Sequence, residues 1–330
     1  NAISILKNSQ INVYHDKIEK VIRIKKMSER YDHKIIGKID LHLPFNTNLR
    51  GTIKNSDLTI SKVRGTIAIN TESTDSDLNN LNGNINITTR GGNISATKLS
   101  GEMELSVVSG DINIFDCDAN SMLTMDNGNI FINGLKGNLL SNTTLGETLV
   151  SNYEGESSVF NINVGNLKIN KSKSNINATI DIGSVNINNI QGATTIFTGK
   201  GEINLNNIIG DVNCNTNFGN VNGINLFGKI NANSELGDIE INKGYNSFLK
   251  DHSVNIATKR GSISIRLPSD LPYAINSQCH NLETRNAISS EIPLDEEFLS
   301  AKVVAQGKIK EGTISCNLSS NYGPISIFTN

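Results

Sequence analysis

The sequence contains no tryptophan, and aromatic residues make up only 5% of the chain. Enzymes that cleave long sugars need paired carboxylates in a groove, and sugar rings are commonly held against aromatic side chains. Outward positions of the repeat described below are mostly Asn, Ser, Thr and short acids. The shortage of aromatic side chains therefore weighs against a carbohydrate-active enzyme and against a glycan-binding adhesin.

Positive and negative charges are nearly balanced. The chain has 30 lysines and arginines and 32 aspartates and glutamates, and its formal net charge is −2. The one dense basic stretch, Arg23, Lys25 and Lys26, lies in an alternating segment that is typical of a strand with a solvated face. A nucleic-acid partner is therefore not expected. No apolar run approaches the roughly 20 residues of a membrane span, so no transmembrane segment is predicted.

Glycine, in contrast, recurs at a fixed spacing. From Gly183 to Leu236 every unit of nine residues begins with glycine, and the spacing extends in both directions with Ser, Thr or Ala at some unit starts. Such regularity predicts a solenoid of stacked units. Glycine suits the unit start because the chain must turn there, and glycine adopts a positive φ without a Cβ clash. One extra residue near Val164 predicts a local bulge at a corner.

Alternate units differ in the offsets of their apolar residues, so the true repeat is a coil of eighteen residues. Apolar residues at positions 3, 5, 12 and 14 alternate with polar ones, which is typical of strands with one buried face. Positions 8 and 18 add one more apolar side chain near each corner. In the coil from Gly201 these positions are occupied by Ile203, Leu205, Ile208, Val212, Cys214 and Phe218, and in the coil from Gly128 the apolar residues are Ile130, Ile132, Leu135, Leu139 and Leu145.

The repeat predicts an all-β protein, a single parallel β-solenoid with two short strands per eighteen-residue coil and about ten coils between Ser56 and Leu236. Residues 56–267 form the predicted solenoid, and residues 1–55 and 268–330 are the predicted N-terminal and C-terminal β caps, because open strand edges must be covered. The predicted cap elements are strands at Ile3–Leu6, Ile11–Tyr14, Val21–Ile24, Ile35–Leu43, Leu282, Lys302–Gln306 and Thr313–Leu318, an acidic turn at Asp295–Glu297 and a closing segment at Gly323–Phe328.

The four cysteines show no CxxC spacing for zinc or redox chemistry. Two of them occupy inward positions of the repeat, and a third follows Ile314 in the same phase, so small core side chains are expected. A disulfide framework is not expected, and an oxidising compartment is not required. The four are Cys117, Cys214, Cys279 and Cys316.

Several segments in a fixed order carry a family resemblance over nearly the whole chain. A strand-like segment ends in Leu43-Pro44, many units contain Gly, an Asp, Asn or Glu, and then Ile-x-Ile, and Gly261–Pro268 follows the pattern Gly-Ser-Ile-x-Ile-x-Leu-Pro. The segments Gly312–Ser315 and Gly323–Ile327 close the pattern. The chain resembles the adhesin-like domain family of unknown function, found in bacterial cell-envelope proteins and in a eukaryotic mitochondrial branch. The long C-terminal tail favours the mitochondrial branch over a cell-envelope or extracellular location, and the resemblance implies no catalytic residue.

Motifs for metals or nucleotides are only approximated. Calcium-binding nonapeptide solenoids require G-G-x-G-x-D turns, and Arg90–Asn93 lacks the later glycine and aspartate. The segment Gly223–Lys229 imitates a phosphate-binding loop, but Ile230 stands where Ser or Thr would hold magnesium. The aspartate pairs Asp75 with Asp77 and Asp116 with Asp118 are expected to be solvated turn carboxylates.

The five histidines are scattered, with none beside an evident nucleophile, so we expect solvated or capping roles for them. They are His15, His33, His42, His252 and His280.

No catalytic, cofactor-binding or metal-binding residue and no small-molecule substrate is therefore predicted. The leading hypothesis is a non-enzymatic structural or interaction protein, a rigid scaffold or accessory subunit that binds a protein partner or a multi-subunit assembly. The alternatives are a cell-surface adhesin that binds glycan and a carbohydrate-active enzyme.

Overall fold

The computed structural model describes residues 11–16, 21–26, 43–280 and 287–330, and the chain forms two compact units, residues 1–43 and 44–330. In the first unit, β1 (Ile11–Asp16) and β2 (Val21–Lys26) form an antiparallel pair, which confirms the two strands predicted there. The predicted strands at Ile3–Leu6 and Ile35–Leu43 lie outside the described residues, apart from Leu43.

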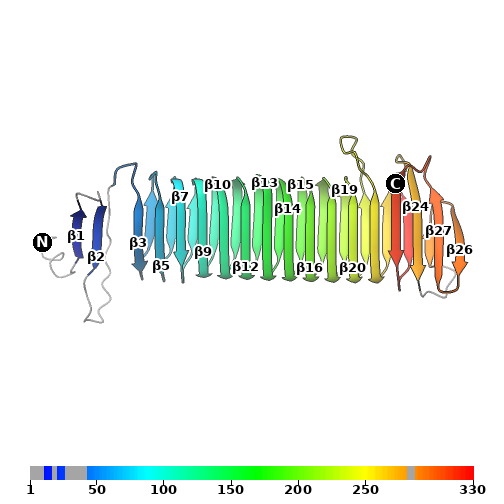
Figure 1. The fold of residues 1–330 in the computed structure, drawn as a ribbon, viewed down its shortest axis with the longest axis horizontal. Coiled ribbons are helices and arrows are strands. Elements are labelled where there is room, and N and C mark those ends of the chain that lie inside the picture. Colours follow the sequence, from blue (N-terminus) through cyan, green and yellow to red (C-terminus); the bar gives the residue numbers. More distant parts are fainter. Residues whose placement is uncertain (1–10, 17–20, 27–42, 281–286) are drawn as a thin grey trace. The chain divides into compact units, whose positions relative to one another are not determined.

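The second unit is a parallel β-solenoid, as predicted. Strands pair in parallel with strands eighteen residues further along the chain, for example Ile203 with Val221 and Thr194 with Val212. The described part of the chain contains strands and no helix. Figure 1 shows these strands standing side by side from β3 toward the C-terminal strands.

Each coil contributes to two strand ladders. The first ladder consists of β3 (Leu49–Lys54), β5 (Ile67–Glu72), β7 (Asn82–Thr89), β9 (Ser100–Ser109), β12 (Leu139–Leu145), β16 (Thr194–Lys200), β18 (Val212–Phe218), β20 (Ile230–Leu236) and β22 (Val254–Arg260). The second consists of β4 (Leu58–Ser61), β6 (Ser76–Asn79), β8 (Ile94–Thr97), β11 (Ile130–Lys136), β15 (Val185–Gln191), β17 (Ile203–Ile209), β19 (Val221–Leu226), β21 (Ile239–Lys243) and β23 (Ile263–Leu267). Three long strands take part in both ladders, namely β10 (Ile112–Asn127), β13 (Thr148–Val164) and β14 (Leu167–Ile182).

The core column is built from the residues that the alternation places inward. Positions 3, 5 and 8 of the coil from Gly201, which are Ile203, Leu205 and Ile208, are buried, and so are Val212 and Cys214. All four cysteines are buried, as predicted for small core side chains.

Position 18 is the exception, because its side chain points outward. The exposed fraction is 50% for Phe218 and 49% for Leu145, so the apolar side chain near this corner lies on the outside, unlike the buried one at position 8. The last inward residue of each coil is at position 16, for example the buried Thr216, and the chain then turns at the corner before it can alternate back. Positions 17 and 18 therefore both face solvent.

The corners explain the residues at the unit starts. Gly183 has a φ of 148°, and a Cβ there would collide with the carbonyl oxygen of Gly165 in the preceding coil. Asparagine occupies another corner with a positive φ, 58° at both Asn189 and Asn207, a conformation that Asn tolerates better than most residues. The extra residue lies between Glu154 and Ser157, where the register of β13 on β14 shifts. The bulge is at a corner, as predicted, but it precedes Val164.

The parallel ladder starts earlier than the repeat suggests. Leu49 in β3 pairs with Ile67 in β5, inside the stretch predicted as the N-terminal cap. Thr47 occupies the unit start that is glycine at Gly65 in the next coil, and Asn48 Oδ1 accepts a hydrogen bond from Thr66 N at 2.8 Å. The first coil was missed because it carries no glycine at this corner.

The C-terminal segment does not follow chain order. Strands β28 (Ile314–Ser320) and β29 (Ile325–Thr329) pair in parallel with β22 and β23, and on their other sides with β24 (Tyr273–His280) and β25 (Ile288–Ser290). The last residues of the chain thus form a coil inserted between two earlier ones, and the red strands of Figure 1 lie between yellow and orange ones. This segment continues the solenoid, although the sequence placed it in the cap.

An antiparallel hairpin follows β24 in the first ladder. It consists of β26 (Leu294–Leu299) and β27 (Lys302–Lys308), and β27 also pairs with β24. The acidic residues Asp295–Glu297 belong to strand β26 and not to a turn, which corrects that prediction. Carboxylates on an outer strand suit that position, because charge discourages edge-to-edge pairing. The predicted strand at Leu282 lies outside the described residues.

Candidate functional site

Exposed apolar side chains form a row along one corner of the solenoid. The row, called the corner row below, takes position 18 from successive coils, and six of its eight members are apolar or aromatic with exposed fractions between 38% and 55%. Its members are Leu145, Val164, Ile182, Lys200, Phe218, Leu236, Arg260 and Tyr322. Exposed large apolar side chains gathered in this way are typical of an interaction site.

The backbone holds the corner row in strict register. Ile182 pairs with Lys200, Lys200 with Phe218, and Phe218 with Leu236 in the parallel ladder. From Leu145 to Leu236, the glycine that follows a row member donates its N–H to the carbonyl of the next member, as Gly201 does to Phe218 at 2.8 Å. Neighbouring row residues are therefore about 4.8 Å apart, the spacing of paired strands.

Buried hydroxyl groups line the inner side of the same corner. Ser234 Oγ donates to the carbonyl of Gly219 at 3.0 Å, and Thr258 Oγ1 donates to that of Gly237 at 3.0 Å. Beside Val164 and Ile182 the inward residue is Ile162 or Ile180, but in the coils that end at Leu145, Phe218 and Leu236 a Ser or Thr at position 16 faces inward while the large apolar residue at position 18 faces solvent. This inversion is the sequence signal that could have identified the row.

Charged side chains accompany the apolar ones. The Lys200 ammonium lies 5.9 Å from the centre of the Phe218 ring, and the Arg260 guanidinium lies 5.7 Å from the centre of the Tyr322 ring. Position 17 adds an exposed ion pair, with Lys259 Nζ 2.6 Å from Glu235 Oε2. A shallow groove runs along this part of the row, lined by Asn217, Phe218, Glu235, Leu236, Lys259, Arg260, Asn321 and Tyr322.

A buried lysine marks a second unusual place, where the loop of residues 244–253 leaves the ladder after β21 (Figure 1). Lys243 is fully buried and pairs with Leu226, so it continues the inward column that Ile190, Ile208 and Leu226 occupy in the preceding coils. Its ammonium donates to the carbonyls of Leu226, at 3.3 Å, and Gly228. Burial lowers the pKa of Lys243 to about 8, and the carboxylates of Asp211 and Asp251 oppose that shift.

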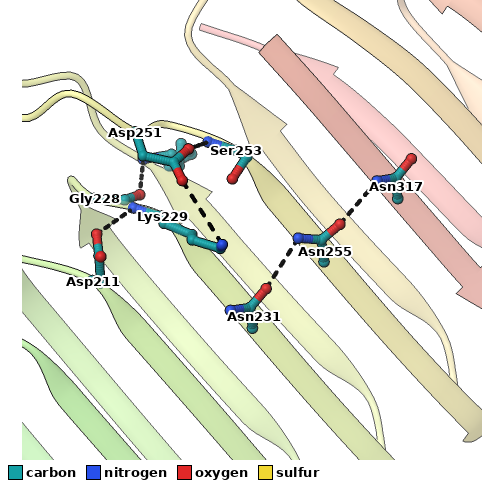
Figure 2. Close-up of polar contacts among 9 residues, drawn as sticks. Asp211, Gly228, Lys229, Asn231, Asp251, Ser253, Asn255 and Asn317 are labelled. Carbon is teal, nitrogen blue, oxygen red and sulfur yellow. Dashed lines mark hydrogen bonds and ion pairs between the residues drawn. The ribbon is translucent and has the colours of Figure 1, made fainter.

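The residues around this loop are tied to one another. Asp251 accepts a hydrogen bond from Ser253 N at 2.9 Å, and its Oδ2 lies 3.8 Å from Lys229 Nζ, as Figure 2 shows. His252 Nδ1 lies 3.0 Å from the carbonyl oxygen of Phe227. Burial, together with the Lys243 cation, lowers the pKa of His252. Lys243 therefore adds a buried donor at the base of the loop, both to the Gly228 carbonyl and to the Leu226 carbonyl, which also accepts a hydrogen bond from Gly244 N at 2.9 Å.

Replacing Lys243 with methionine is expected to remove a pH-dependent contribution to stability. The unfolded chain holds the Lys243 proton up to a pKa of about 10.5, whereas the folded chain releases it near 8. Between these values the unfolded state binds more protons, so stability rises with pH. From pH 7 to pH 10 the wild type should gain roughly 2 to 3 kcal/mol relative to Lys243→Met. Urea unfolding at both pH values measures this difference, and equal gains for the two proteins would contradict it.

The segments that approximate nucleotide-binding or metal-binding motifs form turns and contacts of the repeat. The segment Gly223–Lys229, which imitates a phosphate-binding loop, contains two turns of the repeat. Lys229 N donates to Asp211 Oδ1 at 3.1 Å at a coil corner, and a strand follows where a phosphate-binding loop would have a helix. Asp75 Oδ1 accepts a hydrogen bond from Asn93 N at 2.7 Å across one coil. Within the described ranges, no group of three or more His, Cys, Asp or Glu residues could hold a metal ion.

The histidines that the structure describes lie on different elements of the chain. His15 lies in β1, His252 at the base of the loop and His280 at the end of β24, whereas His33 and His42 lie outside the described residues. The described chain also has no helix with the length and hydropathy needed to cross a membrane.

A second shallow depression on the first ladder contains two acidic residues. Glu104 accepts a hydrogen bond from Asn86 Nδ2 at 2.6 Å, and Glu102 accepts one from Asn120 Nδ2 at 3.0 Å. The residues that line it include Met122 and Leu140 but no aromatic side chain. Both carboxylates are bonded to neighbouring coils, and the depression has no platform for a sugar ring.

Comparison with protein-family models, curated proteins and solved structures finds no match to this chain. The resemblance to the adhesin-like family and the location that it implies therefore stay predictions. The functional argument rests on the corner row.

Proposed function

We propose that this chain is a non-enzymatic interaction protein, a rigid β-solenoid scaffold or accessory subunit that binds a protein partner through the corner row. The observation that carries the proposal is the repeated placement of large apolar side chains at a solvent-facing corner. Phe218 is 50% exposed and Ile182 is 49% exposed, although position 16 beside them is inward. Apolar side chains that stay in water do not stabilise the folded chain. When a partner covers them, apolar surface leaves water, and this favours association.

The scaffold also suits binding by being rigid. Side-chain ladders reinforce the backbone ladders, and Figure 2 shows one of them, in which Asn317 Nδ2 donates to Asn255 and Asn255 Nδ2 donates to Asn231, at 2.8 and 3.0 Å. A row of side chains on such a frame loses little conformational freedom on binding, which favours affinity. The earlier coils carry Ser109 and Asn127 at the same position, so the apolar part of the row is confined to the later coils.

Affinity purification from the source organism tests the proposal. The tagged wild-type chain should bring down a stable, stoichiometric protein assembly. The double variant Phe218→Asp with Leu236→Asp should lose it, because two carboxylates would then have to be desolvated at the interface. The matched control, Ile224→Asp with Met122→Asp, changes exposed apolar residues outside the row, 53% and 42% exposed, and should keep the assembly. Equal recovery with both double variants, or a wild-type chain without any partner, would refute the proposal.

A further inference from the structure

The spacing of the corner row limits which surfaces can match it along its length. Its members follow one another at about 4.8 Å, the distance between paired strands. An α-helix laid along the row presents one turn every 5.4 Å or so, and it would drift out of register by roughly 4 Å from Leu145 to Tyr322. A second β-solenoid of the same kind has the same period and stays in register throughout. A second copy of this chain meets that requirement.

The charges around Phe218 are arranged with opposite signs at equal distances. One coil before Phe218 the row carries Lys200, and one coil after it position 17 carries Glu235. Two coils before Phe218, position 17 carries Asp181, and two coils after it the corner carries Lys259 and Arg260. Three coils away on either side the row is apolar or aromatic, with Val164 and Tyr322.

We propose that two copies of this chain pair along the corner row as an antiparallel dimer, with Phe218 at the two-fold axis. In this arrangement Lys200 of one protomer lies opposite the partner's Glu235. Asp181 lies opposite the partner's Lys259 and Arg260, and Val164 lies opposite the partner's Tyr322. The inference rests on the proposed function, because it identifies the partner that covers the same row.

A parallel pairing is disfavoured by the same residues. It would place Lys200 against Lys200 and Arg260 against Arg260 on facing rungs, and like charges directly opposite one another are destabilising. The antiparallel pairing joins the exposed Lys259–Glu235 pair of each protomer to opposite charges of the other. Charge complementarity of this kind sets the orientation and register of an interface.

Analytical ultracentrifugation of the purified full chain, over a wide range of concentrations, tests the association. The wild type should show a monomer–dimer equilibrium, and Phe218→Asp should weaken it at least about tenfold, as the loss of a central apolar contact does. Ile224→Asp, which adds the same charge to an exposed apolar residue outside the row, should dimerise like the wild type. Circular dichroism should show equal folding of both variants, because the Phe218 and Ile224 side chains are about half exposed.

Cysteine cross-linking tests the geometry, and the native cysteines do not interfere because all four are buried. With a short bis-maleimide reagent, Phe218→Cys should cross-link to itself, because it lies at the axis. Val164→Cys and Tyr322→Cys should each fail alone, because like positions of the two protomers are then six rungs or about 29 Å apart, and should cross-link when mixed. Self-linking of Val164→Cys and of Tyr322→Cys would indicate a parallel pair and overturn the proposal.

The two proposals fail in different ways. A wild-type chain that stays monomeric at every concentration, or equal dimerisation by Phe218→Asp, would overturn the antiparallel dimer. The wild-type chain could instead bind a different protein from the source extract. If the double variant of Phe218 and Leu236 lost that binding, the proposed function would hold with this protein as the partner. If neither the purified chain nor the extract showed binding that depends on the row, both would fall.

Discussion

Replacing Ile203 with aspartate is expected to lower the free energy of unfolding by about 4 kcal/mol or more, because it buries a carboxylate without a partner. Ile203 is fully buried in the core column, and Leu205 on the same strand is 2% exposed and should respond similarly. Ile203 pairs with Val185 and Val221 of the neighbouring coils, and Leu205 pairs with Ile187 of the preceding one, so the surroundings offer no partner to a carboxylate. The shift in the urea midpoint, followed by far-UV circular dichroism, measures the effect.

Asn204→Asp is the matched control, since it introduces the same group between these two residues but on the outer face. Asn204 Oδ1 accepts a hydrogen bond from Asn222 Nδ2 at 2.8 Å, and an aspartate keeps an oxygen there. We expect its midpoint to stay close to that of the wild type. Equal losses at Ile203 and Asn204 would refute the assignment of inward and outward positions.

Deleting residues 313–330 is expected to destabilise the solenoid by at least about 5 kcal/mol, because four fully buried side chains lose their places at roughly 1.5 kcal/mol or more each. These are Cys316, Leu318, Ile325 and Ile327. The deletion also removes a rung that pairs on both sides, with β22 and β24 in the first ladder and with β23 and β25 in the second. Urea unfolding of the shortened chain gives the size of the loss.

A synthetic peptide of residues 313–330 provides the control for this deletion. Added to the shortened chain, it should bind in the vacated rung and raise the midpoint toward that of the full chain. A peptide with Ile325→Asp and Ile327→Asp should not, because both positions are fully buried in the native coil. An unchanged midpoint after the deletion, or rescue by both peptides, would show that the inserted coil is not structurally required.

Much of the fold followed from local pattern alone. The period of the glycines predicted the coil length, and alternation predicted that Ile203, Leu205, Val212 and Cys214 lie inside, as they do. Both signals are local, because a corner requires a residue without a Cβ clash and a strand exposes alternate side chains to opposite faces. The candidate site did not follow from them. Phe218 continues an apolar pattern in the sequence, and only its position beyond the turn places it in solvent.

The sequence by itself determined the repeat, the coil and the composition of the core, because each of these depends on residues close together in the chain. The tertiary structure decided what depends on neighbours in other coils. It placed the extra residue between Glu154 and Ser157, aligned Ile182, Lys200 and Phe218 at one corner, and inserted the last coil between β22 and β24. The unit at Gly323 has the same local pattern as any other rung, and strand pairing is satisfied equally by rungs near or far in sequence. Which rung becomes its neighbour is therefore settled only when the whole stack has formed.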